Sequence, residues 1–180
     1  MKHGLAAAFF LGLAVASTAA MTGCCGKKGS SALLGTTGEL VTINEAGVKI
    51  NAPGGWVRYP AGRWVRFKPS DNMARLAFVT FDRPGEATAL IGQMASQLEL
   101  GSVVWRADAE NGTIGPDKLP ARIGKGDCKI GASNEPCYVE YATVNPGRNT
   151  QLLVVYVVNT AKGAMHKANA QAAVASLSKI

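Results

Sequence analysis

A run of seven apolar residues, Leu152–Val158, sets the strongest condition on how this 180-residue chain can fold. The run is rich in valine, a residue that favours strands. Successive side chains of a strand point to opposite faces of its sheet, so this strand would present apolar side chains on both faces. An antiparallel strand with one face in water alternates apolar and polar residues instead. The sequence therefore predicts a central strand that is covered on both sides.

Shorter patterns supply the layers around this strand. Apolar residues at 87, 90, 91, 94 and 98 have helical spacing, and the alanine-rich stretch 162–179 indicates a closing helix. Turn residues separate the remaining apolar runs; Asn111-Gly112, Gly124–Gly126 and 145–148 are expected to be turns. Strands are predicted at 40–43, 48–50, 63–68, 76–81, 103–105, 137–144 and 151–159. This order predicts an α+β domain, an antiparallel β-sheet flanked by helices.

The N-terminus has the features of an export signal. Lys2 precedes an apolar stretch of 16 residues from Leu5 to Ala20, too short to span a bilayer as a helix. The following Met21-Thr22-Gly23-Cys24 resembles the lipobox of bacterial lipoproteins, which implies lipidation of Cys24. Cleavage without lipidation and an uncleaved anchor are the alternatives. We expect a signal peptide over 1–23, a lipidated N-terminus and flexible linker over 24–38, and one domain over 39–180.

Charge and compartment together limit the partners. The chain carries 19 basic and 12 acidic residues; without Lys2 this becomes 18 and 12, a net charge of +6. A basic cytoplasmic protein would suggest nucleic acid as a partner. A lipid anchor would place the domain at the cell envelope, with the outer membrane favoured because no aspartate directly follows Cys24. We therefore expect contact with the membrane and with an envelope protein or anionic envelope component, and no nucleic acid.

Cys128 and Cys137 lie nine residues apart, far from the membrane end. In an oxidising compartment this spacing favours a disulfide across a hairpin. A metal pair is the alternative. However, zinc takes three or four ligands, and His166 is the only histidine after the signal peptide. We expect no metal and no cofactor.

The sequence contains no catalytic motif. A serine–histidine pair would depend on His166, which is expected on the solvated side of the closing helix. The segment Gly131–Glu135 lacks the final glycine of a nucleophile elbow, and Asp108 with Glu110 is expected to be solvated. We therefore predict no catalytic residues and no enzyme, and hydrolysis is only a distant alternative.

One group of residues combines aromatic and basic character. Along the strand 63–68, alternation separates Val65 and Phe67 from Trp64, Arg66 and Lys68. Trp64, Arg66 and Lys68 would share one face of the sheet with Arg58. This combination predicts a binding surface for an anionic sugar, a lipid headgroup or a protein. The alternative is that Trp56 fills the core and Trp64 packs under a helix, which leaves the arginines in solvent.

The segment Gly47–Trp56, GVKINAPGGW, resembles the opening of the PsbP-like superfamily, which includes DcrB-like envelope lipoproteins. The resemblance extends to the order of elements over 39–180. It implies an α/β/α sandwich and a non-enzymatic role in binding or assembly. The leading hypothesis is therefore a membrane-tethered envelope lipoprotein that binds a protein or another envelope component. A binding module for a small molecule, an anionic glycan or a lipid headgroup is the alternative.

Overall fold

The computed structural model describes residues 37–59 and 62–180, and the chain is an α+β domain of antiparallel strands with two helices. The predicted signal peptide, Cys24 and nearly all of the predicted linker lie outside these residues. Neither described helix is long and apolar enough to cross a membrane. The elements are β1 (Thr37–Ile43), β2 (Val48–Pro53), β3 (Val57–Arg58), β4 (Val65–Lys68), β5 (Ala74–Phe81), α1 (Pro84–Gln97), β6 (Leu100–Trp105), β7 (Glu110–Ile114), β8 (Leu119–Ile130), β9 (Glu135–Val144), β10 (Gln151–Asn159), α2 (Ala164–Ala175) and β11 (Ser178–Lys179).

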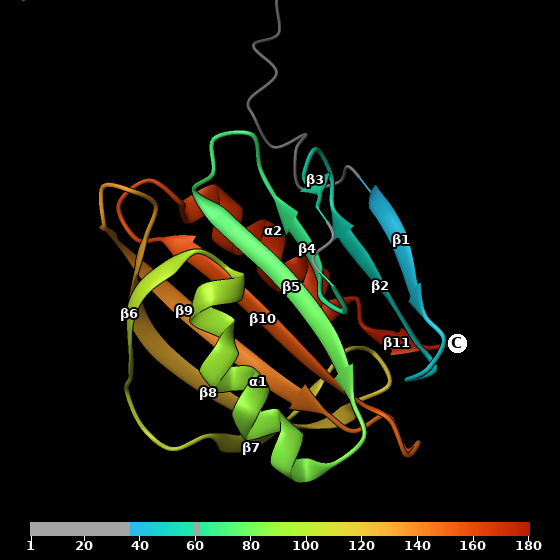
Figure 1. Ribbon diagram of the computed structural model, residues 1–180. Helices are drawn as coiled ribbons and strands as arrows, with labels where there is room; N and C mark the ends of the chain where they lie inside the picture. Colours follow the sequence, from blue (N-terminus) through green and yellow to red (C-terminus); the bar gives the residue numbers. More distant parts are fainter. Residues whose placement is uncertain (1–36, 60–61) are drawn as a thin grey trace, which may run out of the picture.

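Within the described residues the strands form two sheets. The larger has the order β3-β4-β5-β10-β9-β8-β6, and β7 pairs with the first half of β8 on the same edge as β6. The smaller has the order β1-β2-β11. Helix α1 covers one face of the large sheet, and α2 with the small sheet covers the other (Figure 1).

The prediction for Leu152–Val158 is confirmed, because these residues form most of β10 between β5 and β9. Every residue of the run is at most 3% exposed. Leu152, Val154, Tyr156 and Val158 belong to the core beneath α2 and the small sheet, whereas the alternate residues Leu153, Val155 and Val157 belong to the core beneath α1. The strand therefore contributes to two separate cores.

The predicted helices are found, with one change at the C-terminus. Leu90 and Met94 of α1, and Leu98 directly after it, belong to the predicted stripe and are buried in the core between this helix and the large sheet. The closing helix ends at Ala175, and the chain then turns into β11, which pairs with β2. Leu177 is fully buried just before this short strand.

Two turn predictions were wrong. Asn111-Gly112 lies inside β7, and the turn of that hairpin is at 115–118. Gly124–Gly126 lies in the middle of β8, paired with Tyr141 to Val139 of β9. The glycines are there because side chains from neighbouring strands cross over them, and not because the chain turns.

The cysteine prediction agrees with the structure. Cys128 and Cys137 face each other across the β8–β9 hairpin, and their sulfur atoms lie at the disulfide distance of 2.00 Å. Both residues are buried in the core beneath α1. The pair therefore joins the two strands on the face that α1 covers.

Candidate functional site

The predicted aromatic–basic surface does not include an exposed tryptophan. Trp64 is 3% exposed and packs in the core beneath α1, so its inclusion in a binding surface was wrong. Alternation along the strand correctly placed Trp64 and Phe67 on opposite faces of the sheet. However, the face that carries Trp64 is also covered by another layer of the protein. Trp56 is half-buried against the other core, 5.9 Å from the ring of His166. The alternative interpretation therefore describes Trp64, whereas Trp56 packs against the core without being buried in it.

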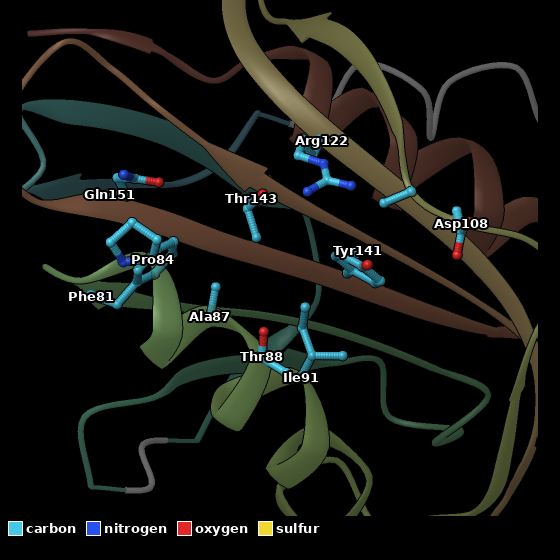
Figure 2. Close-up of a pocket in the computed structure, with 11 residues that line it drawn as sticks. Phe81, Pro84, Ala87, Thr88, Ile91, Asp108, Arg122, Tyr141, Thr143 and Gln151 are labelled. Atoms are coloured by element: carbon cyan, nitrogen blue, oxygen red, sulfur yellow. The ribbon is translucent and has the colours of Figure 1, made fainter.

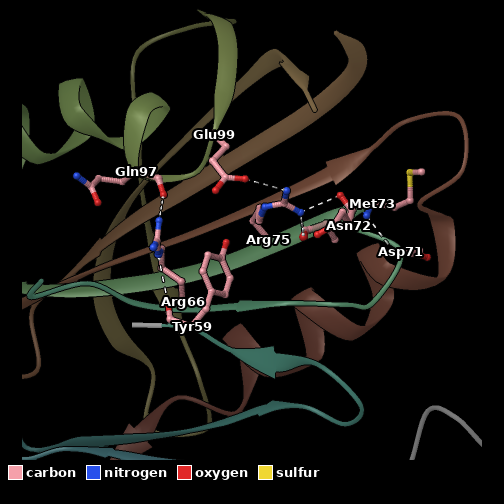
Figure 3. Close-up of polar contacts among 9 residues, drawn as sticks. Tyr59, Arg66, Asp71, Asn72, Met73, Arg75, Gln97 and Glu99 are labelled. Carbon is pink, nitrogen blue, oxygen red and sulfur yellow. Dashed lines mark hydrogen bonds and ion pairs between the residues drawn. The ribbon is translucent and has the colours of Figure 1, made fainter. Parts of the chain in front are cut away.

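Arg66 and Lys68 gather around a different aromatic residue, Tyr59. The Arg66 guanidinium lies 4.4 Å from the centre of the Tyr59 ring, and Lys68 Nζ lies 5.0 Å from it. Arg66 also donates hydrogen bonds to the carbonyl oxygens of Gln97, at the end of α1, and of Tyr59 (Figure 3). Burial raises the pKa of the Tyr59 hydroxyl. These contacts hold α1 against β4, which is a structural role.

The next cation on this face, Arg75, is also held by the fold. Its side chain is 3% exposed, and its Nη1 donates hydrogen bonds of 2.8 Å to the carbonyl oxygens of Asn72 and Ala74. Its Nη2 lies 3.6 Å from the carboxylate of Glu99 (Figure 3). A buried arginine with these partners fixes the turn before β5 and cannot reach a ligand.

Arg58, the last residue of the predicted surface, forms an ion pair of 2.8 Å with Glu39. The pair joins the edge strand β3 to β1 of the small sheet. Trp64, Arg66 and Arg58 are therefore committed to the fold, whereas Lys68 contacts the Tyr59 ring and forms no ion pair or side-chain hydrogen bond among the described residues.

His166 is also not where it was predicted. It is 8% exposed rather than solvated, because α2 packs this side chain against the turn before β5. Its Nε2 donates a hydrogen bond of 2.8 Å to Asp71, and its buried Nδ1 has no partner among the described residues. The histidine is paired with a carboxylate and not with a serine, which gives no support to a hydrolase.

A cleft of about 360 Å³ opens between α1 and the β8–β9 part of the large sheet (Figure 2). Its α1 side is mostly apolar, and its sheet side carries charged and polar groups. The apolar lining is Phe81, Pro84, Ala87, Ile91 and Ala109, and the polar lining is Thr88, Asp108, Arg122, Tyr141, Thr143 and Gln151.

Tyr141 forms the wall of this cleft, and two glycines hold it there. Its ring makes an edge-to-face contact with Trp105, with centroids 5.0 Å apart. A Cβ at Gly124 would overlap the Tyr141 ring, and one at Gly126 would lie 2.7 Å from the Val104 carbonyl oxygen and 2.9 Å from the Trp105 ring. The two aromatic rings can therefore lie over β8 only because both positions are glycine.

Arg122 and Asp108 carry the charges of the cleft. Arg122 pairs with Thr143 in the β8–β9 register and so lies on the same face as Tyr141, whereas Asp108 comes from the segment between β6 and β7. Both side chains are exposed. Across residues 37–59 and 62–180 neither forms an ion pair or a side-chain hydrogen bond. Both charges are available to a ligand.

In two other cavities, the arginines are bound to neighbouring groups of the protein. In a cavity of about 420 Å³ beside α2, Arg106 is bound to Asp127 by two hydrogen bonds of 2.8 and 2.6 Å. In a cavity of about 290 Å³ between the sheets, Arg58 is paired with Glu39 and Arg63 donates to the carbonyl oxygen of Thr80. The cleft beside α1 is therefore the better candidate for a ligand site.

Sequence reasoning missed this cleft, although one signal for it was present. Glycines two residues apart on a strand leave one face of that strand bare, so a neighbouring aromatic side chain can cross it. Gly124 and Gly126 have this spacing, and Tyr141 lies on the correctly predicted strand 137–144. The positions of Arg122 and Asp108 beside it depend on strand register, which the sequence pattern leaves open. Nowhere in the described part of the chain do three His, Cys, Asp or Glu side chains converge as metal ligands.

The fold defines an α+β domain with a twisted antiparallel sheet between two covering layers. It is similar to a crystal structure from Bacteroides thetaiotaomicron VPI-5482, with a TM-score of 0.54 at 14% sequence identity. The match covers 80% of this chain and 49% of that one, so the chain spans about half the length of that protein. No protein family and no curated protein matches the sequence. The similarity therefore concerns the fold alone.

Proposed function

We propose that the protein is a lipid-anchored envelope protein whose domain binds a small polar ligand, without catalysis, in the cleft beside α1. The observation that carries this proposal is the pair of uncommitted charges, Arg122 and Asp108, around the wall formed by Tyr141. Small-molecule sites combine an apolar lining with a few placed polar groups in about 300–1,000 Å³. The cleft lies at the small end of that range, and its lining combines apolar side chains with a larger share of polar groups, which suits a small polar ligand.

The envelope location rests on the N-terminal sequence. Gly23-Cys24 directly follows the apolar stretch, and the Cys128–Cys137 pair suits an oxidising compartment. Metabolic labelling with a radioactive fatty acid tests the anchor. We expect label on the wild-type protein and none on Cys24→Ser; equal labelling of both would contradict lipidation of Cys24.

We also infer that the domain is related to the PsbP-like sandwiches. Support comes from the helix on each face of the large sheet and from the order of β2, the turn at 54–55 and Trp56. The small sheet beside α2 would then be an addition to the α/β/α arrangement. This kinship agrees with a binding role, although a fold alone does not specify function.

Thermal-shift screening of the full chain against sugars, sugar acids, amino acids and short peptides tests the binding function. We expect at least one compound to stabilise the wild type, and this stabilisation to be lost in Tyr141→Ala. A second cleft variant is Arg122→Gln, and Lys125→Gln is its matched control. Both substitutions remove one positive charge from β8, but residues 122 and 125 point to opposite faces of the sheet.

Two results would count against this function. If no compound stabilises the protein, the cleft is not a small-ligand site. If an envelope protein is instead captured equally well by the wild type and by Tyr141→Ala, the domain binds a protein partner elsewhere on its surface.

A further inference from the structure

We infer that the cleft selects a zwitterion, with Arg122 binding its carboxylate, Asp108 its ammonium group, and the α1 side its apolar body. A free amino acid or a short peptide has this chemistry. The inference rests on the proposed function and specifies the ligand class of the same site. It starts from the finding that two opposite charges line one cleft and yet do not pair with each other.

The backbone separates these two charges. Arg122 lies in a strand that is paired on both sides, with Asn111 of β7 and Thr143 of β9. Asp108 lies outside that ladder, between β6 and β7. The two side chains stand at different places along the sheet side of the cleft (Figure 2). A ligand with both charges can therefore satisfy both residues at once.

Ligands with a single charge fit this pair less well. An anionic sugar could use Arg122 and the Tyr141 ring, but it would be repelled by Asp108. A cation would gain from Asp108 and from the ring face, but it would be repelled by Arg122. A zwitterion gains at both ends, because charge-assisted hydrogen bonds are the stronger kind.

The remaining lining suits the body of such a molecule. Pro84, Ala87 and Ile91 present an apolar surface from α1 for an aliphatic side chain. Thr88 adds a hydroxyl from the same helix, and Gln151 adds an amide at the start of β10, where a peptide group could exchange hydrogen bonds. The site therefore offers separate contacts for the charged ends, the side chain and the backbone of an amino acid or short peptide.

Calorimetric titration of the full chain with leucine, N-acetylleucine and leucinamide tests the inference. These compounds are a zwitterion, an anion and a cation with one shared side chain. The same three forms of a leucine dipeptide and tripeptide vary the distance between the charges. At the best length we expect the zwitterion to bind about tenfold more tightly than either blocked form, because each blocked form loses one charge-assisted contact.

Two variants show which residue binds which charged end of the ligand. Asp108→Asn should abolish the preference over the N-acetyl form, and Arg122→Gln the preference over the amide, whereas Lys125→Gln should change neither. Both cleft residues are exposed, so unchanged thermal unfolding will show that the variants fold. Equal affinity of the zwitterion and its blocked forms at every length, or no binding by any of them, would contradict the inference that the cleft selects a zwitterion.

Titration with glucuronate, an anionic sugar, distinguishes a wrong ligand class from the absence of any ligand site in the cleft. If it binds the wild type but not Tyr141→Ala, the cleft remains a small-ligand site and only the zwitterion is wrong.

Discussion

Gly124 and Gly126 carry no side chain, yet they determine the shape of the cleft. A methyl group at Gly124 would occupy the space of the Tyr141 ring. We therefore expect Gly124→Ala to destabilise the protein by about 1–3 kcal/mol, the usual cost of overpacking, and to weaken ligand binding. Chemical denaturation measures the first effect and calorimetry the second.

Gly92→Ala provides the opposite case. This glycine lies inside α1, and a Cβ there would meet nothing within 4 Å. We expect stabilisation by about 0.5–1 kcal/mol, because alanine loses less conformational freedom in a helix. If Gly124→Ala were neutral or stabilising, as Gly92→Ala is expected to be, the contact at Gly124 would not control the position of Tyr141.

The Asp71–His166 pair adds a dependence on pH. Partial burial would raise the pKa of Asp71, but hydrogen bonds from the Met73 amide and from His166 outweigh this and lower it. A carboxyl whose pKa is lower in the folded state stabilises the protein above its unfolded pKa of about 3.9. That contribution is lost as the pH falls through the folded pKa.

We therefore expect Asp71→Asn to flatten the fall of unfolding free energy between about pH 5 and pH 2. The loss at neutral pH should stay below about 1 kcal/mol, because the Asp71 side chain is 51% exposed and the interaction is screened. Urea unfolding at several pH values measures this. Asp108→Asn removes a carboxylate that has no partner among the described residues, and it should leave the profile unchanged.

Among the elements, the β8–β9 hairpin is closed by Cys128 and Cys137. For a loop of this length, chain entropy gives a stabilisation of about 2.7 kcal/mol. We expect the double variant Cys128→Ala, Cys137→Ala to be destabilised by about this amount and to unfold identically with and without a reductant. If a reductant that has access to the unfolded protein leaves the wild-type midpoint unchanged, the bond does not contribute.

The elements also differ in how far their sequences determine them. β10 and α1 could be predicted, because a two-sided apolar run and a helical stripe each fit one environment. β8 could not, because its glycines resemble turn residues until the side chains that cross them are known. Trp64 was misplaced for a related reason: alternation gives the face of a residue, but not whether another layer covers that face.

For the whole molecule, the segment after α2 holds several parts together. Leu177 is fully buried, Ser176 accepts a hydrogen bond from the Asn51 amide, and the Lys179 amide donates to Asp117 in the β7–β8 turn. We expect Leu177→Ala to cost about 2–5 kcal/mol, as for other buried leucines. Ile180→Ala, at a position 62% exposed, should change stability by less than about 0.5 kcal/mol in the same denaturation experiment.

The place of the cysteine pair also bears on the order in which the molecule assembles. Cys128 and Cys137 are 6% and 1% exposed, covered by the layer that contains α1. Thiol–disulfide exchange requires an attacking thiolate to reach the sulfur. An oxidant reaches the two sulfur atoms more readily before this layer packs over the hairpin, and we therefore expect oxidation to precede docking of α1. Once α1 is docked, the same helix shields the bond from reduction until the domain opens.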